Sequence, residues 1–307
     1  MKLAVPDLIS NSYFPAVAAV ELGLFARQGL DVTVELMVPI EQAFAAMRDG
    51  TLDFLGCSAH LLVGGFPEWQ GARLLCAQAQ GMYWFLIMRA DLKAQRGDLD
   101  VLKGRRIGAA PWVAMGLRRL LAETGYDLER DAITIASIPG AHGAGINFGV
   151  TAAQALADGK VDGFWANGMG AEIAVRRDVG RIVLDVRRGD GPKACFDYTM
   201  PVLAATNALI ERAPQAAGAA VRAIVETHKA LKQDVELAKK VGRKLFPLSE
   251  AELIVELVRR DLPYYNAAIT RDFVARMTQF SREVGILKGH PTYEEVVAVQ
   301  FAPLWKP

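Results

Sequence analysis

The first third of the chain alternates between two hydrophobic patterns. Short apolar or alternating runs predict strands at 3–6, 31–38, 53–57, 73–80 and 83–90. Apolar residues at helical spacing predict helices over 14–27 and 40–50, and Asn11 or Ser12 can cap the first of these helices. Strands and helices that alternate with short links indicate a mostly parallel sheet covered by helices on both faces.

The same rhythm restarts near residue 90. Further strands are predicted at 105–110, 132–138, 161–166 and 181–186, and helices at 113–124, 151–159 and 169–178. From residue 198 onward the pattern is mostly helical, with candidate helices at 206–212, 214–245, 249–260, 270–285 and 292–300. The pattern therefore predicts two α/β units and a helical C-terminal region.

Composition and charge narrow the function classes. The 307 residues are 52% hydrophobic, which is enough for a sizeable core. Because 35 basic and 34 acidic side chains nearly cancel, and nucleic-acid-binding proteins are usually basic, we expect no nucleic-acid partner. Arginine pairs such as Arg187–Arg188 are scattered, and we interpret them as solvated faces. Three widely spaced cysteines without a CxxC motif argue against a zinc site or a disulfide scaffold, but leave one disulfide open. No cofactor is expected.

The sequence leaves two cellular compartments open. No apolar run reaches the roughly 18 residues of a membrane span. The segment MKLAVPDLISN lacks the apolar core and cleavage site of a signal peptide. The protein is therefore expected in the cytoplasm, or in the periplasm if a signal peptide has been removed.

Four segments carry a resemblance to a known family. They are SNSYFPAVAAVELGLFARQGLDVTVELM, QAFAAMRDGTLDFLGCSA, LKGRRIGAAPWVAMGLRRLL and QALADGKVDGFWANGMGAEIAV. Together they resemble the substrate-binding proteins of sulfonate, taurine, nitrate and thiamine-precursor ABC transporters, the thiamine-pyrimidine-synthase-like family. The resemblance implies an α/β, two-lobed type II periplasmic-binding-protein fold. It places lobe one at 1–88 plus 198–307 and lobe two at 89–197, with ligand bound in the cleft by lobe closure. The implied partners are a small-molecule ligand and the membrane permease and ATPase of an ABC transporter, and a monomer is expected.

Candidate ligand-binding residues follow from the position of loops and helix starts. Ligands of open α/β sheets bind beyond the carboxyl ends of the strands. The candidates are Ser10, Asn11, Ser12, Tyr13, Ser58, His60, Tyr83, Trp84, Trp112, Asn167 and Tyr198. Each has a structural alternative, because the polar residues can cap helices and the aromatic residues can pack in the core. No residue is assigned a catalytic or metal-binding role.

The balance of aromatic and charged candidates indicates the ligand class. Aromatic candidates outnumber fixed charges, of which Arg89 and Asp197 are the nearest in sequence. Pro111 and Trp112 stand where many anion-binding relatives carry Gly, Ser and Thr, which argues against sulfonate, phosphate or nitrate. The expected ligand is an aromatic or heterocyclic carboxylate or a pyrimidine-like compound.

An enzyme on the same fold is the alternative function. Thiamine-pyrimidine synthases of this family carry a His/Cys-rich iron cluster, but this chain offers only Cys195 there and no adjacent His. Some decarboxylases share the two-lobed fold, and His60 and His142 are the acid–base candidates for such chemistry. A cytosolic ligand sensor is the third reading.

Overall fold

The computed structural model describes residues 1–141 and 147–306 and divides the chain into two units. The first unit is Met1–Gly81 with Thr199–Pro307, and the second is Met82–Tyr198. The expected first crossover after residue 88 falls inside a strand of the second unit's sheet, so the crossover lies earlier, after Gly81. The chain returns to the first unit after Tyr198.

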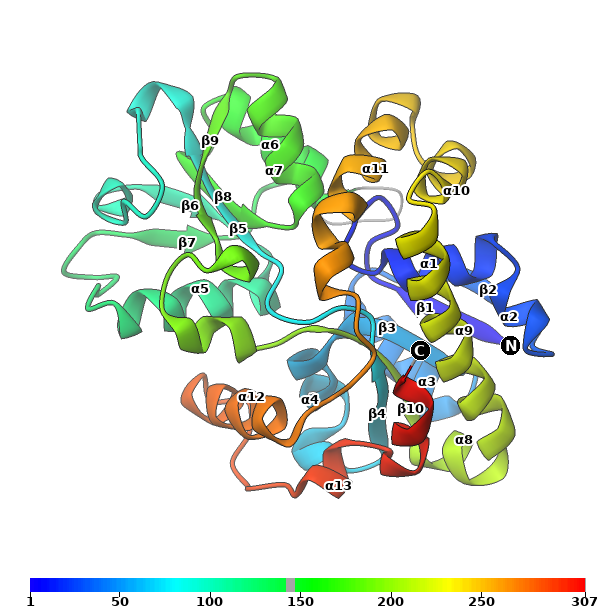
Figure 1. Ribbon diagram of the computed structural model, residues 1–307. Coiled ribbons are helices and arrows are strands. Elements are labelled where there is room, and N and C mark those ends of the chain that lie inside the picture. Colours follow the sequence, from blue (N-terminus) through cyan, green and yellow to red (C-terminus); the bar gives the residue numbers. More distant parts are fainter. Residues whose placement is uncertain (142–146, 307) are drawn as a thin grey trace. The chain divides into compact units, whose positions relative to one another are not determined.

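The first unit is built on a five-stranded sheet in the order β2-β1-β3-β10-β4 (Figure 1). Its strands are β1 (Lys2–Val5), β2 (Thr33–Leu36), β3 (Phe54–Ser58), β4 (Ala72–Ala77) and β10 (Pro201–Thr206). β1 pairs in parallel with β2 and β3, whereas β10 runs antiparallel between β3 and β4. The carboxyl ends of β1, β3 and β4 therefore share one edge of the sheet with the amino end of β10.

β10 is the strand that the hydrophobic pattern misses. The pattern from residue 198 onward is mostly helical and predicts no strand before the candidate helix at 206–212, but Pro201–Thr206 is a buried strand. A short apolar run cannot be assigned to helix or strand by periodicity alone, and alanine at 204 and 205 favours helix. Pairing with two flanking strands decides the conformation here, and the helix begins only after Thr206.

Ten α-helices surround this sheet in the described part of the first unit. They are α1 (Phe14–Glu21), α2 (Leu24–Arg27), α3 (Ile40–Asp49), α4 (Leu62–Gly65), α8 (Asn207–Arg212), α9 (Pro214–Gln233), α10 (Leu237–Leu245), α11 (Leu248–Asp261), α12 (Arg271–Glu283) and α13 (Tyr293–Val296). The predicted helix over 14–27 is broken at Gly23, which has φ 70°. The predicted helix over 214–245 ends at Gln233 and restarts as α10.

The second unit has its own five-stranded sheet, in the order β7-β6-β8-β5-β9. Its strands are β5 (Phe85–Arg89), β6 (Arg106–Gly108), β7 (Thr134–Ala136), β8 (Gly163–Ala166) and β9 (Gly180–Asp185), and its α-helices in the described residues are α5 (Pro111–Glu123), α6 (Phe148–Ala157) and α7 (Gly168–Arg176). β5 runs antiparallel between β8 and β9. The carboxyl ends of β6 and β8 therefore share an edge with the amino end of β5.

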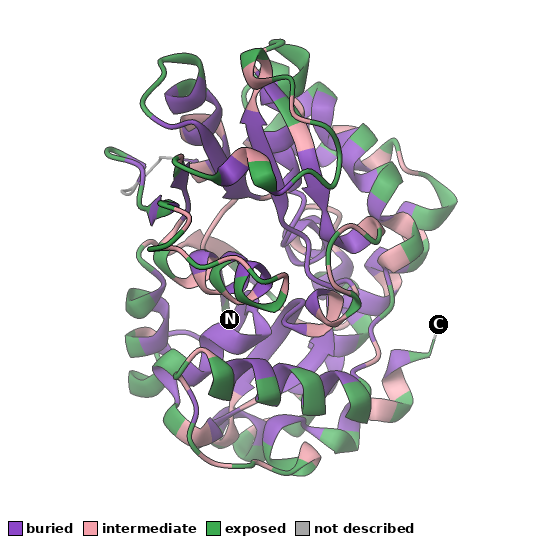
Figure 2. Ribbon diagram, turned by 90° about the vertical axis from the view of Figure 1, so that its left-hand side faces the viewer, coloured by how far each residue is buried: buried purple, intermediate pink, exposed green. Residues whose placement is uncertain are grey.

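Both sheets are mixed rather than wholly parallel, because each contains one strand that runs against its neighbours. In each unit the strands are largely buried, while the helices carry exposed residues on their outer sides (Figure 2). Among the described residues, no helix combines the length and apolar character needed to cross a membrane.

Candidate functional site

The first unit gathers polar side chains at the edge where β1 and β3 end. Ser10, Asn11 and Ser12 lie in the loop after β1, and Ser58 is the last residue of β3. All four side chains are buried, with exposed fractions of 1–3%. Because β1 and β3 are parallel neighbours, their carboxyl ends meet at one edge, and this brings together residues that are nearly fifty positions apart in sequence.

Hydrogen bonds link this edge. The Tyr13 hydroxyl and Ser58 Oγ share a hydrogen bond of 3.4 Å, and the Ser12 amide donates to Ser10 Oγ at 3.0 Å. Contrary to the expected helix capping, Tyr13 occupies the N-cap position of α1, and no side chain caps that helix. Asn11 and Ser12 are therefore not used as helix caps.

Asn11 has a distant partner that sequence spacing cannot indicate. Its Nδ2 donates to Asp261 Oδ2 at 2.6 Å, across 250 positions of sequence. Its Oδ1 and the Ser12 Oγ are buried and have no hydrogen-bond partner among the described residues. An unpaired buried polar atom costs about 1–3 kcal/mol. Two such atoms on adjacent residues therefore make this loop a candidate for hydrogen bonds with a bound ligand.

His60 lies beside the same edge, and its ring is fixed by contacts with other residues of the first unit. Its ring is fully buried, and Nδ1 shares a hydrogen bond of 3.0 Å with Thr199 Oγ1 at the start of the returning chain. The ring also meets Phe280 of α12 edge-on, with centroids 5.6 Å apart. These contacts explain the position of His60 by packing and hydrogen bonding.

The second unit presents aromatic side chains at the edge where β5 begins. Tyr83 and Trp84 immediately precede β5, and both are 2% exposed. Their rings meet edge-on at 5.5 Å, and Trp84 meets Trp165 of β8 at 6.1 Å. The Trp165 indole donates to the carbonyl of Val113 at 3.1 Å, which ties β8 to the start of α5.

Close packing around Trp84 fixes this aromatic group. A Cβ at Gly116 of α5 would come within 2.8 Å of the Trp84 ring and 3.3 Å of Met82 Sδ. Only glycine leaves room for the indole at this point of the helix. Trp112, one turn earlier, is partly exposed at the start of α5.

Two further candidates make contacts within the second unit. Asn167 caps α7, because its Oδ1 accepts from the amides of Met169 (3.0 Å) and Gly170 (3.3 Å). The buried Tyr198 hydroxyl donates to the Glu123 carboxylate at the end of α5. Burial, followed by hydrogen bonds to Cys195 and Glu123, raises the pKa of Tyr198 well above its usual range. These contacts give both residues a structural role.

Arg187 is a buried cation beside the edge where β5 begins, which its place in a basic pair does not predict. The arginine pair was expected on a solvated face, but Arg187 is 3% exposed and lies just after β9. Its guanidinium carbon lies 5.5 Å from the centre of the Tyr83 ring. A buried cation over an aromatic ring is the type of group that recognises a carboxylate. Arg89, by contrast, ends β5 at the opposite edge and pairs with Asp91 and Asp162.

The cysteine thiols offer no reactive group at either edge. Cys57, Cys76 and Cys195 are buried free thiols, so the disulfide that the sequence left open is not formed. Burial raises the pKa of Cys195 to about 12 and raises the pKa of the other two further. Over residues 1–141 and 147–306, no group of three or more His, Cys, Asp or Glu side chains could hold a metal ion. The candidate His142 lies outside the described residues.

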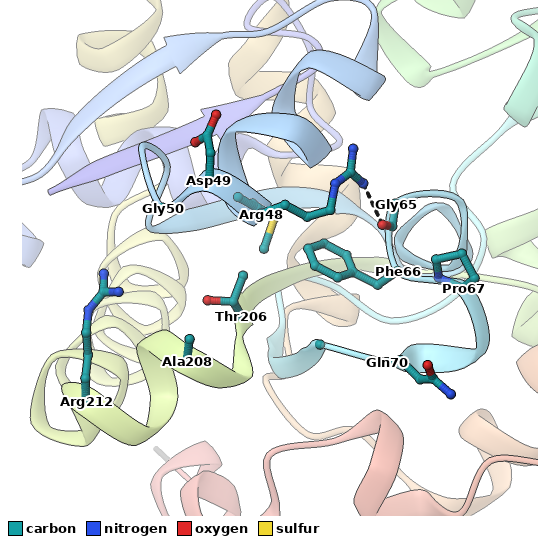
Figure 3. A pocket seen from close by; sticks show the side chains of 12 residues that line it. Arg48, Asp49, Gly50, Gly65, Phe66, Pro67, Gln70, Thr206, Ala208 and Arg212 are labelled. Carbon is teal, nitrogen blue, oxygen red and sulfur yellow. Dashed lines mark hydrogen bonds between the residues drawn. The ribbon is translucent and has the colours of Figure 1, made fainter.

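A pocket of about 600 Å³ lies elsewhere in the first unit (Figure 3). It is lined by Gly50 and Gly71, just before β3 and β4, and by Thr206 at the end of β10. It therefore lies at the edge of the sheet opposite to Ser10–Tyr13. Arg48 lines it but donates to the Gly65 carbonyl at 2.7 Å. None of the predicted ligand-binding residues lines this pocket.

Comparison with known proteins places this architecture in a class. Two mixed α/β units joined by two crossovers are the type II periplasmic-binding-protein fold. The chain belongs to the NMT1/THI5-like family, whose model matches residues 10–236. No curated protein matches the chain in sequence.

Solved structures with the same fold include binding proteins and an enzyme. The putative periplasmic sulfonate-binding protein SsuA of Methylobacillus flagellatus is 17% identical, with TM-score 0.68 and coverage of 99% of this chain and 92% of its own. The periplasmic nitrate-binding protein NrtA of Synechocystis is 15% identical, with TM-score 0.74 and coverage of 99% and 86%. The desulfurization enzyme DSZB is 16% identical, with TM-score 0.65 and coverage of 98% and 97%. At these low identities, the TM-scores show a shared fold and nothing further.

Proposed function

We propose that the chain is the solute-binding protein of an ABC transporter, and that it binds a small organic ligand between its two units by closure. The ligand is an aromatic or heterocyclic carboxylate or a pyrimidine-like compound. The permease and ATPase of the transporter are its partners, and the periplasm is its compartment once a signal peptide has been removed. The family and the fold shared with SsuA and NrtA support the transport role.

The observation that carries the ligand class is the contrast between the two sheet edges. The second unit offers the rings of Tyr83 and Trp84 with the buried cation of Arg187, and the first offers polar atoms of Asn11 and Ser12. Aromatic contacts are worth about 0.5–1.5 kcal/mol beyond area burial. An arginine pairs with a carboxylate through charge-assisted hydrogen bonds. A flat ring with polar ends matches both edges.

An enzyme on this fold is the competing function, and the DSZB likeness keeps it in view. The buried thiols, whose pKa values are raised, argue against a cysteine nucleophile or a thiolate metal ligand. The His60 ring is fully buried and is engaged with Thr199 and Phe280, which gives it a packing role that needs no catalysis. Simple binding requires none of these groups to react.

A thermal-shift screen tests the proposal. The panel holds benzoate, nicotinate, cytosine, uracil, ethanesulfonate and nitrate. At a hundredfold excess over Kd, a ligand stabilises the fold by about 2.7 kcal/mol, or roughly 5 °C for a chain of this size. We expect ring compounds to give the shift. A shift confined to nitrate and ethanesulfonate would contradict the ligand class, and no shift with any compound would contradict the binding role.

A matched pair of variants places the ligand on the aromatic edge. Tyr83→Leu removes the ring under Arg187, whereas Tyr126→Leu removes a partly exposed ring of the same unit that contacts Lys103 and Asp100. We expect Tyr83→Leu to weaken the best ligand at least fivefold and Tyr126→Leu to leave its affinity unchanged. Equal affinities in the two variants would remove the aromatic edge from the site.

A further inference from the structure

The orientation of the Asn11 amide is set by a buried carboxylate. Asn11 is 3% exposed and Asp261, the last residue of α11, is 2% exposed. Asn11 Nδ2 lies 2.6 Å from Asp261 Oδ2. A carboxylate has no proton to donate, so only the amide nitrogen can face it. Turning the amide over would place Oδ1 against a carboxylate oxygen, and Asp261 therefore holds Asn11 in one orientation.

This orientation leaves an acceptor for the ligand. Asn11 Oδ1 is buried and has no hydrogen-bond partner among the described residues. The adjacent Ser12 Oγ is likewise buried without a hydrogen-bond partner among the described residues, although the Ser12 amide donates to Ser10 Oγ. A carbonyl oxygen accepts hydrogen bonds and cannot donate them. A group that pairs with Asn11 Oδ1 must therefore bring its own proton.

We propose that the ligand presents an N–H or O–H donor to Asn11 Oδ1, and that Asp261 is the positioning residue that imposes this requirement. The inference rests on the proposed binding function and narrows its ligand class. Amines, amides, amidines, ring N–H groups and hydroxyls meet the requirement. Nitrate and simple alkanesulfonates do not, because they carry acceptor oxygens alone. The donor requirement thus separates this chain from neighbours that are named as nitrate-binding and sulfonate-binding proteins.

Matched compounds test the requirement on the wild-type protein. The pairs are cytosine with N4,N4-dimethylcytosine, 4-hydroxybenzoate with 4-methoxybenzoate, and taurine with ethanesulfonate, all measured by titration calorimetry. Leaving a buried acceptor unpaired costs about 1–3 kcal/mol, which corresponds to roughly 5- to 150-fold in affinity. We expect the donor-bearing member of each binding pair to bind at least tenfold more tightly. Equal affinity within every binding pair would overturn the inference and leave the binding function standing. No binding by any compound would overturn the proposed function and the inference with it.

Two variants assign the selectivity to these residues. Asp261→Asn allows the Asn11 amide to face either way, so the affinity ratio within a pair should fall at least threefold. Asn11→Leu removes the acceptor and should abolish the preference. Asp162→Asn is the matched control, because it alters a similarly buried carboxylate that pairs with Arg89 and Arg106 in the other unit. A loss of folding alone would not change the ratio within a pair. An affinity ratio that stays at its wild-type value in both site variants would overturn the role of Asn11 and Asp261. If Asp261→Asn does not fold, the ratio measured with Asn11→Leu decides the question.

Discussion

Protonation of His228 should make the first unit lose stability in mild acid. The ring is buried in α9, stacks on Tyr265 at 5.2 Å and pairs through Nε2 with the Gln78 carbonyl at 2.8 Å. Because a carbonyl only accepts, Nε2 carries the proton in the neutral ring. Burial lowers the pKa of His228 from 6.5 to about 4; the hydrogen bond to Gln78 opposes this shift, and the nearby Lys232 adds to it.

The sign and size of the effect follow from this pKa. Well above pH 6.5 the ring is neutral in both the folded and the unfolded chain, so its contribution to stability no longer changes with pH. Between pH 6.5 and about 4 the unfolded chain takes up a proton that the folded chain excludes. At pH 5 this favours unfolding by about 2 kcal/mol relative to pH 8.

The assay compares urea unfolding of the wild type and His228→Gln at pH 8 and pH 5. Gln can still donate to the Gln78 carbonyl but does not titrate. The wild type should lose about 2 kcal/mol more than the variant over this range. His290→Gln, at an exposed position on the same unit, should behave as the wild type. Equal losses in the wild type and His228→Gln would show that protonation of His228 does not drive the loss, whatever the absolute stability of the variant.

Three further predictions concern the second unit. Gly116→Ala should displace the Trp84 ring, because the added Cβ would lie 2.8 Å from it. We expect urea unfolding to show a loss of about 1–3 kcal/mol, together with a changed tryptophan emission spectrum. An unchanged spectrum would contradict this. Because the Arg187 guanidinium is buried over Tyr83, Arg187→Gln should weaken the binding of an aromatic carboxylate at least tenfold in calorimetry. Binding of the corresponding primary amide should be little affected. Equal losses of affinity for the carboxylate and the amide would show that Arg187 has a structural role only. The Cys195 thiol, whose pKa is raised to about 12, should react with a thiol reagent at pH 8 only as fast as the protein unfolds; rapid labelling of the native protein would contradict its burial.

The sequence pattern predicts most of the elements, because their burial is local and periodic. The helix expected over 40–50 is α3, Ile40–Asp49, whose buried residues fall on one face. The strand expected at 53–57 is β3, Phe54–Ser58. β10 escapes prediction because its strand character depends on β3 and β4 on either side. The pattern around a residue does not contain that information.

The candidate site is predictable in its loops but not in its partners. Asn11 follows a strand, Ser58 ends one and Tyr83 precedes one, so their places at the two edges can be anticipated. The bond from Asn11 to Asp261 spans 250 positions and requires the fold itself. Arg187 looks like any arginine in a basic pair, and only its position over Tyr83 distinguishes it from a solvated side chain.

The most direct test of the account is to bind a ligand and recover it. The wild-type chain is titrated by calorimetry with the ring compound that gives the largest thermal shift, and the contents of the cell are then analysed by mass spectrometry. We expect one equivalent bound per chain and full recovery of the compound, chemically unchanged. Conversion of the compound into a product by the wild-type chain would contradict a solute-binding function and establish an enzyme on this fold.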